Sequence, residues 1–294
     1  MRSPNSALRP DNIRKQQTFS EAPTVIGARS RSIFRWAGSK KRLLPVLVNA
    51  APKKFGKYVE PFAGSACLFL SLAPAKAALG DINGELIGAY EAIRERPEYV
   101  WRLAKSIPRS KSAYYEIRSK NPKKLGKFSR AARFAYLNRL CFNGLYRTNQ
   151  AGGFNVPRGT RTGRFPTLSE YRRFSEALKN ASLIHGDFEK TLKHVESGDF
   201  VYLDPPYASI TVKDRNEYGV GSFKPADIPR LLKSLRRIHR KGARFLLSYS
   251  IAPDFLAQLP KTGIRRIRIK RSIASEARFR KVVSEVLLTN EDLF

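Results

Sequence analysis

The chain has 294 residues and carries 56 lysines and arginines against 24 aspartates and glutamates, so its formal charge is +32. Because 42% of the residues are hydrophobic, the chain can bury a core, which excludes wholesale disorder. The two cysteines, Cys67 and Cys141, are too few for a disulfide scaffold and lack the paired spacing of a structural zinc site. These features predict a folded protein of a reducing compartment.

The charge and the hydropathy pattern together favour a nucleic-acid partner. The most apolar stretch, residues 66–79, is interrupted by Pro74 and Lys76 and is shorter than the roughly 20 residues that a membrane span needs. The basic N-terminus is followed by no apolar segment of the kind found in secretory signals. Excess cations favour a polyanion, and without a lipidation signal or a basic amphipathic helix, nucleic acid is favoured over a membrane surface. We therefore expect a cytoplasmic protein without a membrane partner.

The chain alternates between strand and helix patterns after a basic tail. Residues 1–32 are rich in Arg, Ser, Asn, Gln and Pro and are expected to form a flexible tail. From Phe34 onward, short apolar runs bounded by Gly, Pro and Asp alternate with helical patterns, which is typical of an α/β fold. The expected strands are Tyr58–Glu60, Ala77–Gly80, Ser182–His185, Phe200–Leu203, Phe245–Tyr249, Ile264–Ile269 and Ser284–Thr289. The last two are expected to form an antiparallel pair.

Residues 103–181 interrupt this alternation with a strongly basic segment. They contain 18 lysines and arginines and 3 glutamates, a net charge of 18 − 3 = +15. Helices are expected at Ala113–Lys120 and Arg130–Leu140, followed by a Gly-, Asn- and Arg-rich loop or hairpin at Asn143–Thr167. We interpret residues 103–181 as an inserted subdomain, with residues 33–102 and 182–294 forming the main domain.

The first strand leads into a turn that is suited to a bound cofactor. Glu60 ends this strand, and the small residues around Gly64 precede an apolar helix that begins near Cys67, as in dinucleotide-binding turns. Asp81 ends the next strand, close to the distance of about 20 residues at which such folds place a carboxylate on ribose hydroxyls. Two alternatives remain open: Gly64 could serve only the turn, and Asp81 could cap the following helix.

Two further segments add candidate cofactor contacts. Trp36 and Lys40 place an aromatic ring and a cation close together, although Trp36 could belong to the core and Lys40 to the surface. Asp187 and Phe188 follow a predicted strand and would hold an adenine ring by a hydrogen bond and stacking. These two residues could equally form an ordinary turn at the end of that strand.

The most informative element is the segment Asp204–Tyr207, which follows a buried strand. Open α/β sheets bind ligands at the carboxyl ends of their strands, where Asp204 is expected. Pro205 and Pro206 make the following loop stiff, and Tyr207 adds a flat aromatic face.

This segment suits methylation of an exocyclic amine such as N6 of adenine. The lone pair of that nitrogen is delocalised into the ring, so the nitrogen attacks poorly until acceptors bind its hydrogens. The Asp204 carboxylate and the Pro205 carbonyl are two such acceptors at a fixed spacing. Tyr207 would stack on a base flipped out of a duplex. A sulfonium methyl donor needs no metal, and His185, His194 and His239 are scattered, so no metal site is expected.

The four motifs Trp36–Lys40, Glu60–Ser65, Asp81–Asn83 and Asp204–Tyr207, in this order, resemble the Dam-like (D12 class) DNA N6-adenine methyltransferases, which use S-adenosylmethionine. The resemblance implies a Rossmann-like methyltransferase fold, with a mostly parallel sheet and an antiparallel C-terminal hairpin. It implies cofactor contacts from Trp36, Lys40, Glu60, Phe62, Gly64, Asp81, Asp187, Phe188 and Asp204, and catalytic roles for Asp204, Pro205, Pro206 and Tyr207.

The basic insert resembles the target-recognition hairpin of the same family. Leu145 would wedge between base steps and Arg147 would contact guanine, with Asn143, Asn149 and Arg158 as further contacts to double-stranded DNA. The alternative is that Arg147 binds a phosphate and Leu145 belongs to the core. Family members with this hairpin commonly recognise GATC.

The sequence therefore predicts an adenine-specific DNA methyltransferase, and other functions stay open beside it. An RNA adenine methyltransferase would use the same chemistry, and an inactive DNA-binding protein would use the same scaffold. Cytosine N4 is the less favoured acceptor, because the family pattern there has Ser where this chain has Asp204. A monomer is expected, and a separate cognate restriction nuclease is compatible with the sequence.

Overall fold

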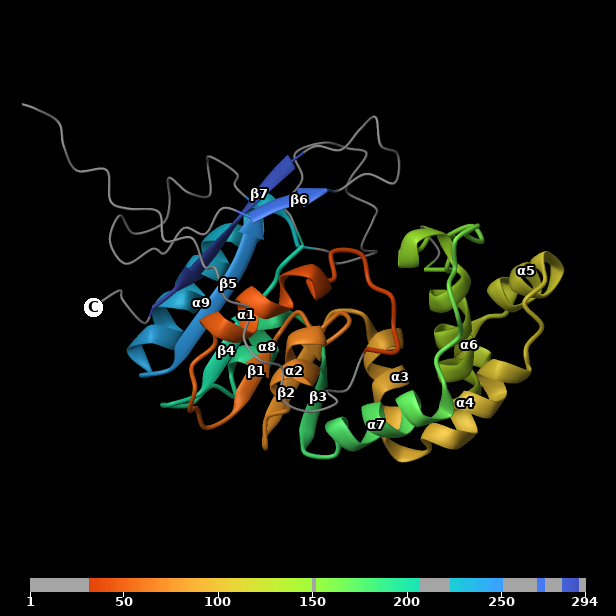
Figure 1. Cartoon of the computed structure of the whole chain (residues 1–294), viewed down its shortest axis with the longest axis horizontal. Coiled ribbons are helices and arrows are strands. Elements are labelled where there is room, and N and C mark those ends of the chain that lie inside the picture. Colours follow the sequence, from red (N-terminus) through yellow and green to blue (C-terminus); the bar gives the residue numbers. More distant parts are fainter. Residues whose placement is uncertain (1–31, 150–151, 207–222, 251–268, 273–281, 291–294) are drawn as a thin grey trace, which may run out of the picture.

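The computed structural model describes residues 32–149, 152–206, 223–250, 269–272 and 282–290 (Figure 1). Within these residues, seven strands form one sheet in the order β3-β2-β1-β4-β5-β7-β6. The strands are β1 (Tyr58–Glu60), β2 (Ala77–Asp81), β3 (Ala181–His185), β4 (Phe200–Leu203), β5 (Arg244–Ser250), β6 (Ile269–Ser272) and β7 (Val282–Thr289). β1 to β5 pair in parallel, and β7 pairs antiparallel with both β5 and β6.

This sheet confirms the predicted fold class. The first five strands agree with the expected positions to within a residue at either end, and the C-terminal pair is antiparallel as expected. The sixth strand was expected at Ile264–Ile269, but β6 begins at Ile269, and residues 264–268 lie outside the described part of the chain. The predicted tail, residues 1–32, falls outside it except for Ser32.

The helices are α1 (Leu44–Ala50), α2 (Cys67–Leu72), α3 (Gly84–Glu95), α4 (Pro97–Ser106), α5 (Lys111–Ser119), α6 (Lys127–Leu140), α7 (Leu168–Leu178), α8 (Phe188–Leu192) and α9 (Ile228–Arg240). The two helices that were expected in the insert correspond to α5 and α6. Among the helices of the described residues, none is long and apolar enough to span a membrane.

Alternating strand residues supply two cores, one on each face of the sheet. In β4, Phe200 and Tyr202 enter the cluster that α1, α2, α3 and α7 cover, whereas Val201 and Leu203 enter the cluster under α8 and α9. This alternation follows from the two-residue period of a strand. All four residues are buried, so β4 is a central strand with a continuous apolar run, as parallel sheets require.

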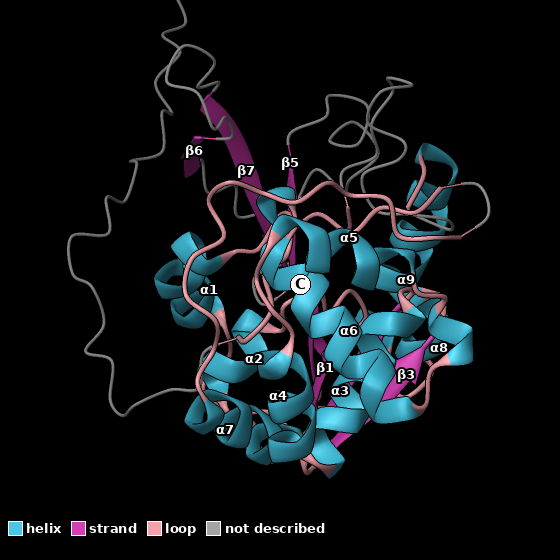
Figure 2. Cartoon of the chain, turned by 90° about the vertical axis from the view of Figure 1, so that its right-hand side faces the viewer, coloured by secondary structure: helices cyan, strands magenta, loops and turns pink. Residues whose placement is uncertain are grey.

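The insert packs at the end of the sheet occupied by α3, to the right of the sheet in Figure 1 and toward the viewer in Figure 2. Helices α4, α6 and α7 pack against α3 or against one another, and Leu103, where the insert was expected to begin, lies inside α4. A separate small cluster, which includes Tyr114, Tyr136 and Phe154, joins α5 and α6 to the segment after α6. The division of the chain into a main domain and an insert stays a prediction.

Candidate active site

A pocket opens at the carboxyl ends of β1, β2 and β4. β1 and β4 are neighbours in the sheet, and the helices that follow them cover opposite faces, so a crevice forms between the two strand ends. The pocket is lined by every residue that was expected to hold the cofactor: Trp36, Lys40, Glu60, Phe62, Gly64, Asp81, Asp187, Phe188 and Asp204. Pro205 and Pro206 also line it, and Tyr207 lies outside the described residues.

The turn after β1 has a strained backbone. Gly64 has φ +47°, and Ala66, the residue before α2, has φ +49°, which is uncommon for a residue with a side chain. A Cβ atom at Gly64 would lie 2.7 Å from Cδ1 of Trp36. Because the backbone conformation and the Trp36 ring both favour glycine here, the turn is sufficient to explain Gly64, and the close approach of a cofactor to it stays a prediction.

Asp81 ties this turn to the end of β2. Its carboxylate accepts hydrogen bonds from the backbone N–H of Gly64 and of Asn83, both at 2.9 Å. Asn83, and not Asp81, caps α3, because its side chain accepts from the N–H of Leu86; the capping alternative for Asp81 is therefore wrong. Burial raises the pKa of Asp81 to about 6, against the lowering effect of these two N–H groups.

Glu60 lies deeper in the same pocket. The hydroxyl of Tyr58 donates to its carboxylate at 3.0 Å, and both residues are buried. Burial raises the pKa of Glu60 well above its ordinary value, and the charges of Asp204 and Asp81 raise it further, whereas the Tyr58 bond lowers it. Three carboxylates thus converge on one pocket from the ends of three neighbouring strands.

Three phenylalanine side chains form an apolar wall of the pocket. Phe62 stacks on Phe188 with a centroid distance of 5.4 Å, and Phe223 meets Phe62 edge-on at 6.0 Å. Asp187 caps α8, and Arg230 of α9 holds the Asp187 carboxylate at 2.7 Å. The sequence analysis missed Phe223 and Arg230; the only signal for Phe223 was an aromatic residue shortly before a helix start.

Asp204 follows β4 and is held by two groups from other elements. Nζ of Lys40 lies 2.7 Å from its Oδ1 atom, and the hydroxyl of Ser248 on β5 donates to the same atom at 2.9 Å. Lys40 is only 4% exposed, so it belongs to the site and not to the surface. Pro205 and Pro206, which follow, remove two backbone donors from the loop. The carboxylate therefore has a fixed orientation at the mouth of the pocket.

The segment after α6, expected as a loop or hairpin over residues 143–167, folds back as a hairpin whose pairs span residues 141–158. Isolated antiparallel pairs join Cys141 to Arg158 and Thr148 to Phe154.

Two of the predicted DNA contacts are oriented by bonds within this hairpin. Nε of Arg147 donates to the side chain of Asn155 at 2.9 Å, which orients the guanidinium. The side chain of Asn149 accepts from the N–H of Gly153 at 2.8 Å, which closes the turn. Nη2 of Arg158 donates to a backbone carbonyl of the insert, so part of this side chain serves the structure of the insert itself.

A short turn at the base of the hairpin, residues Phe142–Gly144, presents an aromatic ring. Asn143 is exposed and has φ +53°, and the neighbouring Phe142 is 44% exposed. Leu145 is half-buried and packs against the small cluster that contains Tyr114 and Tyr136. The sequence analysis did not assign a role to Phe142, although the Asn-Gly pair that follows it is a signal for an exposed turn.

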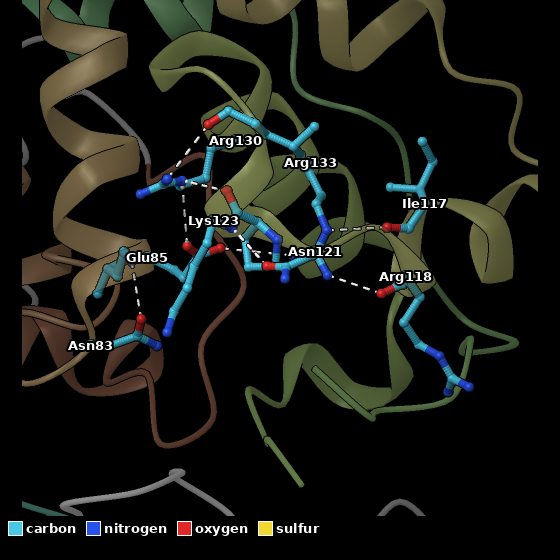
Figure 3. Close-up of polar contacts among 11 residues, drawn as sticks. Asn83, Glu85, Ile117, Arg118, Asn121, Lys123, Arg130 and Arg133 are labelled. Atoms are coloured by element: carbon cyan, nitrogen blue, oxygen red, sulfur yellow. Dashed lines mark hydrogen bonds and ion pairs between the residues drawn. The ribbon is translucent and has the colours of Figure 1, made fainter. Parts of the chain in front are cut away.

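A polar cluster anchors the insert to the helix that starts at the pocket (Figure 3). Arg133 of α6, which is 5% exposed, lies 3.7 Å from the Glu85 carboxylate in the first turn of α3. Its other nitrogens donate to the carbonyls of Ile117 and Arg118 at the end of α5. The Arg118 guanidinium in turn donates to the carbonyl of Val156 in the hairpin. One buried arginine thus joins the pocket helix to the elements that support the hairpin.

A second connection runs through the segment before α1. Trp36 lies over Gly64 in the pocket and stacks on Tyr146 of the hairpin, with a centroid distance of 6.3 Å and an interplanar angle of 19°. The backbone of Arg35 exchanges two hydrogen bonds with the Asn138 side chain of α6. The pocket and the hairpin are therefore held against the same short segment.

No group of three or more His, Cys, Asp or Glu side chains in the described part of the chain is arranged to hold a metal ion.

Comparison with known protein families agrees with the geometry of the pocket. Residues 36–282 match the family described as D12 class N6 adenine-specific DNA methyltransferase.

Individual relatives are similar over most of this chain. A type II methyltransferase of Lactococcus lactis subsp. cremoris is 34% identical over 88% of this chain and 95% of its own length. A DNA N-6-adenine-methyltransferase of Escherichia phage P1 is 33% identical over 87% of this chain and 35% of its own length. The DNA adenine methylase of Escherichia coli K12 is 29% identical over 88% of this chain and 95% of its own length. The chain belongs to the D12 class of N6 adenine-specific DNA methyltransferases.

Proposed function

We propose that this chain methylates N6 of adenine in duplex DNA, with Asp204 and the Pro205 carbonyl binding the amine. The observation that carries the proposal is the position of Asp204: its carboxylate lies at the mouth of the pocket, on a proline-stiffened loop, and is held by Lys40 and Ser248. Two acceptors on adjacent residues bind the amine hydrogens and stabilise the positive charge that develops on nitrogen. Their fixed spacing means that little reorganisation is needed during the reaction.

The pocket fits S-adenosylmethionine by its chemistry. Asp81 offers carboxylate oxygens to ribose hydroxyls, and each of these oxygens has a second lone pair beyond its backbone bond. Phe62, Phe188 and Phe223 offer an apolar wall to the adenine ring, and Asp187 offers an acceptor to its amine. When bound, S-adenosylmethionine supplies a methyl carbon that its sulfonium makes electrophilic. The half-buried carboxylate of Asp204, at the mouth of the pocket, places negative charge near such a cation.

The target base must leave the duplex to reach this loop, so we propose base flipping. The exposed ring of Phe142, in the turn at the base of the hairpin, would enter between base steps, with Leu145 packed behind it. The oriented guanidinium of Arg147 would make a bidentate contact to guanine. Asn143, Asn149 and Arg158 would contact the surrounding backbone, where the insert's charge of +15 is favourable.

The test is transfer of a tritiated methyl group to duplex DNA and, in a parallel reaction, to ribosomal RNA. Wild-type protein should label the duplex, and Asp204→Ala should abolish labelling while duplex binding persists. Full activity of Asp204→Ala would refute the catalytic assignment, and labelling of RNA alone would refute the DNA substrate. Expression in a host without DNA methylation, followed by single-molecule sequencing, then identifies the methylated site.

A further inference from the structure

A chain of three side chains extends from the core of the sheet to Asp204. The hydroxyl of Tyr202 on β4 lies 3.1 Å from the hydroxyl of Ser248 on β5, and the Ser248 hydroxyl lies 2.9 Å from Oδ1 of Asp204. Tyr202 and Ser248 are buried. The pairing of β4 with β5 sets this arrangement, because it places Tyr202 opposite Leu246, two residues before Ser248.

The direction of these hydrogen bonds follows from their chemistry. A serine hydroxyl has one hydrogen, and a carboxylate can only accept. Ser248 therefore donates its hydrogen to Asp204 and accepts the hydrogen of Tyr202. Each bond polarises the next, so the Tyr202 hydroxyl makes Ser248 a stronger donor.

We propose that Ser248 is a positioning residue for the methyl transfer: with Tyr202 behind it, it fixes the orientation of the Asp204 carboxylate and keeps it charged. The inference rests on the proposed function, in which Asp204 binds the amine of the target base. Ser248 touches neither the base nor the cofactor in this role and acts through Asp204 alone.

The charged groups around Asp204 explain why such a donor matters. Lys40, from the segment before α1, stabilises the negative charge, whereas the nearby carboxyl of Glu60 on β1 opposes it. Tyr202 on β4 and Cys67 on α2 also lie near this carboxylate: burial raises the pKa of both groups, and the charge of Asp204 raises it further. Loss of the Ser248 donor removes one of the groups that favour the charged form. The pKa of Asp204 should then rise.

A purely structural role for Ser248 makes a different prediction. In that case its hydroxyl only satisfies the buried Tyr202 hydroxyl, and its loss lowers stability without changing the chemistry. The two roles are therefore separated by the pH dependence of the methylation rate, which stability alone does not change.

The experiment measures single-turnover methylation of a duplex by Ser248→Ala, from pH 5 to pH 9. We expect the rate at neutral pH to fall roughly tenfold, with affinities for duplex and S-adenosylmethionine within about twofold of wild type. The acid limb of the profile should move to higher pH by about one unit. Ser248→Thr, which keeps the hydroxyl, should recover the wild-type acid limb. Ser234→Ala, which removes a buried serine hydroxyl from α9 away from the pocket, should behave as wild type.

Tyr202→Phe keeps the proposal testable even if Ser248→Ala does not fold. Tyr202→Phe should also move the acid limb to higher pH, but by less than Ser248→Ala does. Combined with Ser248→Ala, it should cause no further shift of the acid limb. A wild-type acid limb in both Ser248→Ala and Tyr202→Phe would overturn the proposal. Asp204→Ala in the same assay distinguishes failure of the proposed function from failure of the role of Ser248. If Asp204→Ala stays active, the proposed function fails. If Asp204→Ala is inactive while Ser248→Ala matches wild type, only the role of Ser248 fails.

Discussion

We predict that the carboxylate of Asp81 makes the binding of S-adenosylmethionine sensitive to pH. Burial raises its pKa from an ordinary 3.8 to about 6, although the N–H groups of Gly64 and Asn83 lower it. Ribose hydroxyls donate more strongly to a carboxylate than to a neutral carboxylic acid. Protonation of Asp81 should therefore weaken the binding of S-adenosylmethionine as the pH falls through about 6.

The size of the effect follows from the population of the charged form. With a pKa of about 6, roughly nine-tenths of Asp81 is charged at pH 7 and roughly one-tenth at pH 5. If only the charged form binds well, the apparent affinity falls about tenfold, or about 1.4 kcal/mol, between these two values. The same raised pKa means that the folded state binds this proton more tightly than the unfolded chain. The contribution of Asp81 to the free energy of unfolding should therefore decrease as the pH rises from about 4 to about 6.

Calorimetric titration of S-adenosylmethionine at several pH values measures the affinity directly. Asp81→Asn is the matched control, because its amide does not titrate, and any remaining pH dependence then belongs to Glu60 or to the cofactor. The ratio of the wild-type affinity to the Asp81→Asn affinity should fall about tenfold from pH 7 to pH 5. A ratio that stays constant over this range would refute the reasoning.

Four further substitutions test the packing and the recognition hairpin. Gly80→Ala places a Cβ atom 1.9 Å from the Thr191 hydroxyl and should lower the free energy of unfolding by about 1–3 kcal/mol in urea titration. Gly88→Ala in α3, where a Cβ meets nothing within 4 Å, should instead be neutral or stabilising by up to about 1 kcal/mol. Arg133→Met leaves Glu85 without its buried partner and should lower stability by about 3 kcal/mol, measured in the same way. Arg147→Gln should reduce discrimination between cognate and non-cognate duplexes by about 1–3 kcal/mol in competition binding, and an equal loss on both duplexes would indicate a phosphate contact instead.

The fold and the acidic part of the site could be predicted because both depend on where strands end. Glu60, Asp81 and Asp204 each follow a short apolar run, and parallel strands bring their carboxyl ends to one edge of the sheet. Local sequence was therefore enough to place three carboxylates in one pocket. It was not enough to decide between Asp81 and Asn83 as the cap of α3, because both residue types cap helices and they are only two positions apart.

The remaining site residues could not be predicted because tertiary pairing brings them together. Tyr202 and Ser248 belong to apolar strands that look like ordinary core, and only the pairing of β4 with β5 connects their hydroxyls to Asp204. Arg133 is one cation among the 18 lysines and arginines of the insert, and nothing in its local sequence distinguishes a buried arginine from a DNA-binding one.

Burial divides the cations of this chain into two kinds with different sensitivity to salt. Lys40 and Arg133 are buried, and each lies near a half-buried carboxylate, Asp204 or Glu85, where mobile ions screen less than at the open surface. The exposed cations of the insert face solvent, and we expect their contribution to duplex binding to depend on releasing counterions from DNA. Salt should therefore weaken the capture of DNA while leaving the orientation of Asp204 intact. We therefore expect the large positive charge to determine how tightly the duplex is held, and the Lys40–Asp204 ion pair to determine what happens to a base once it reaches the pocket.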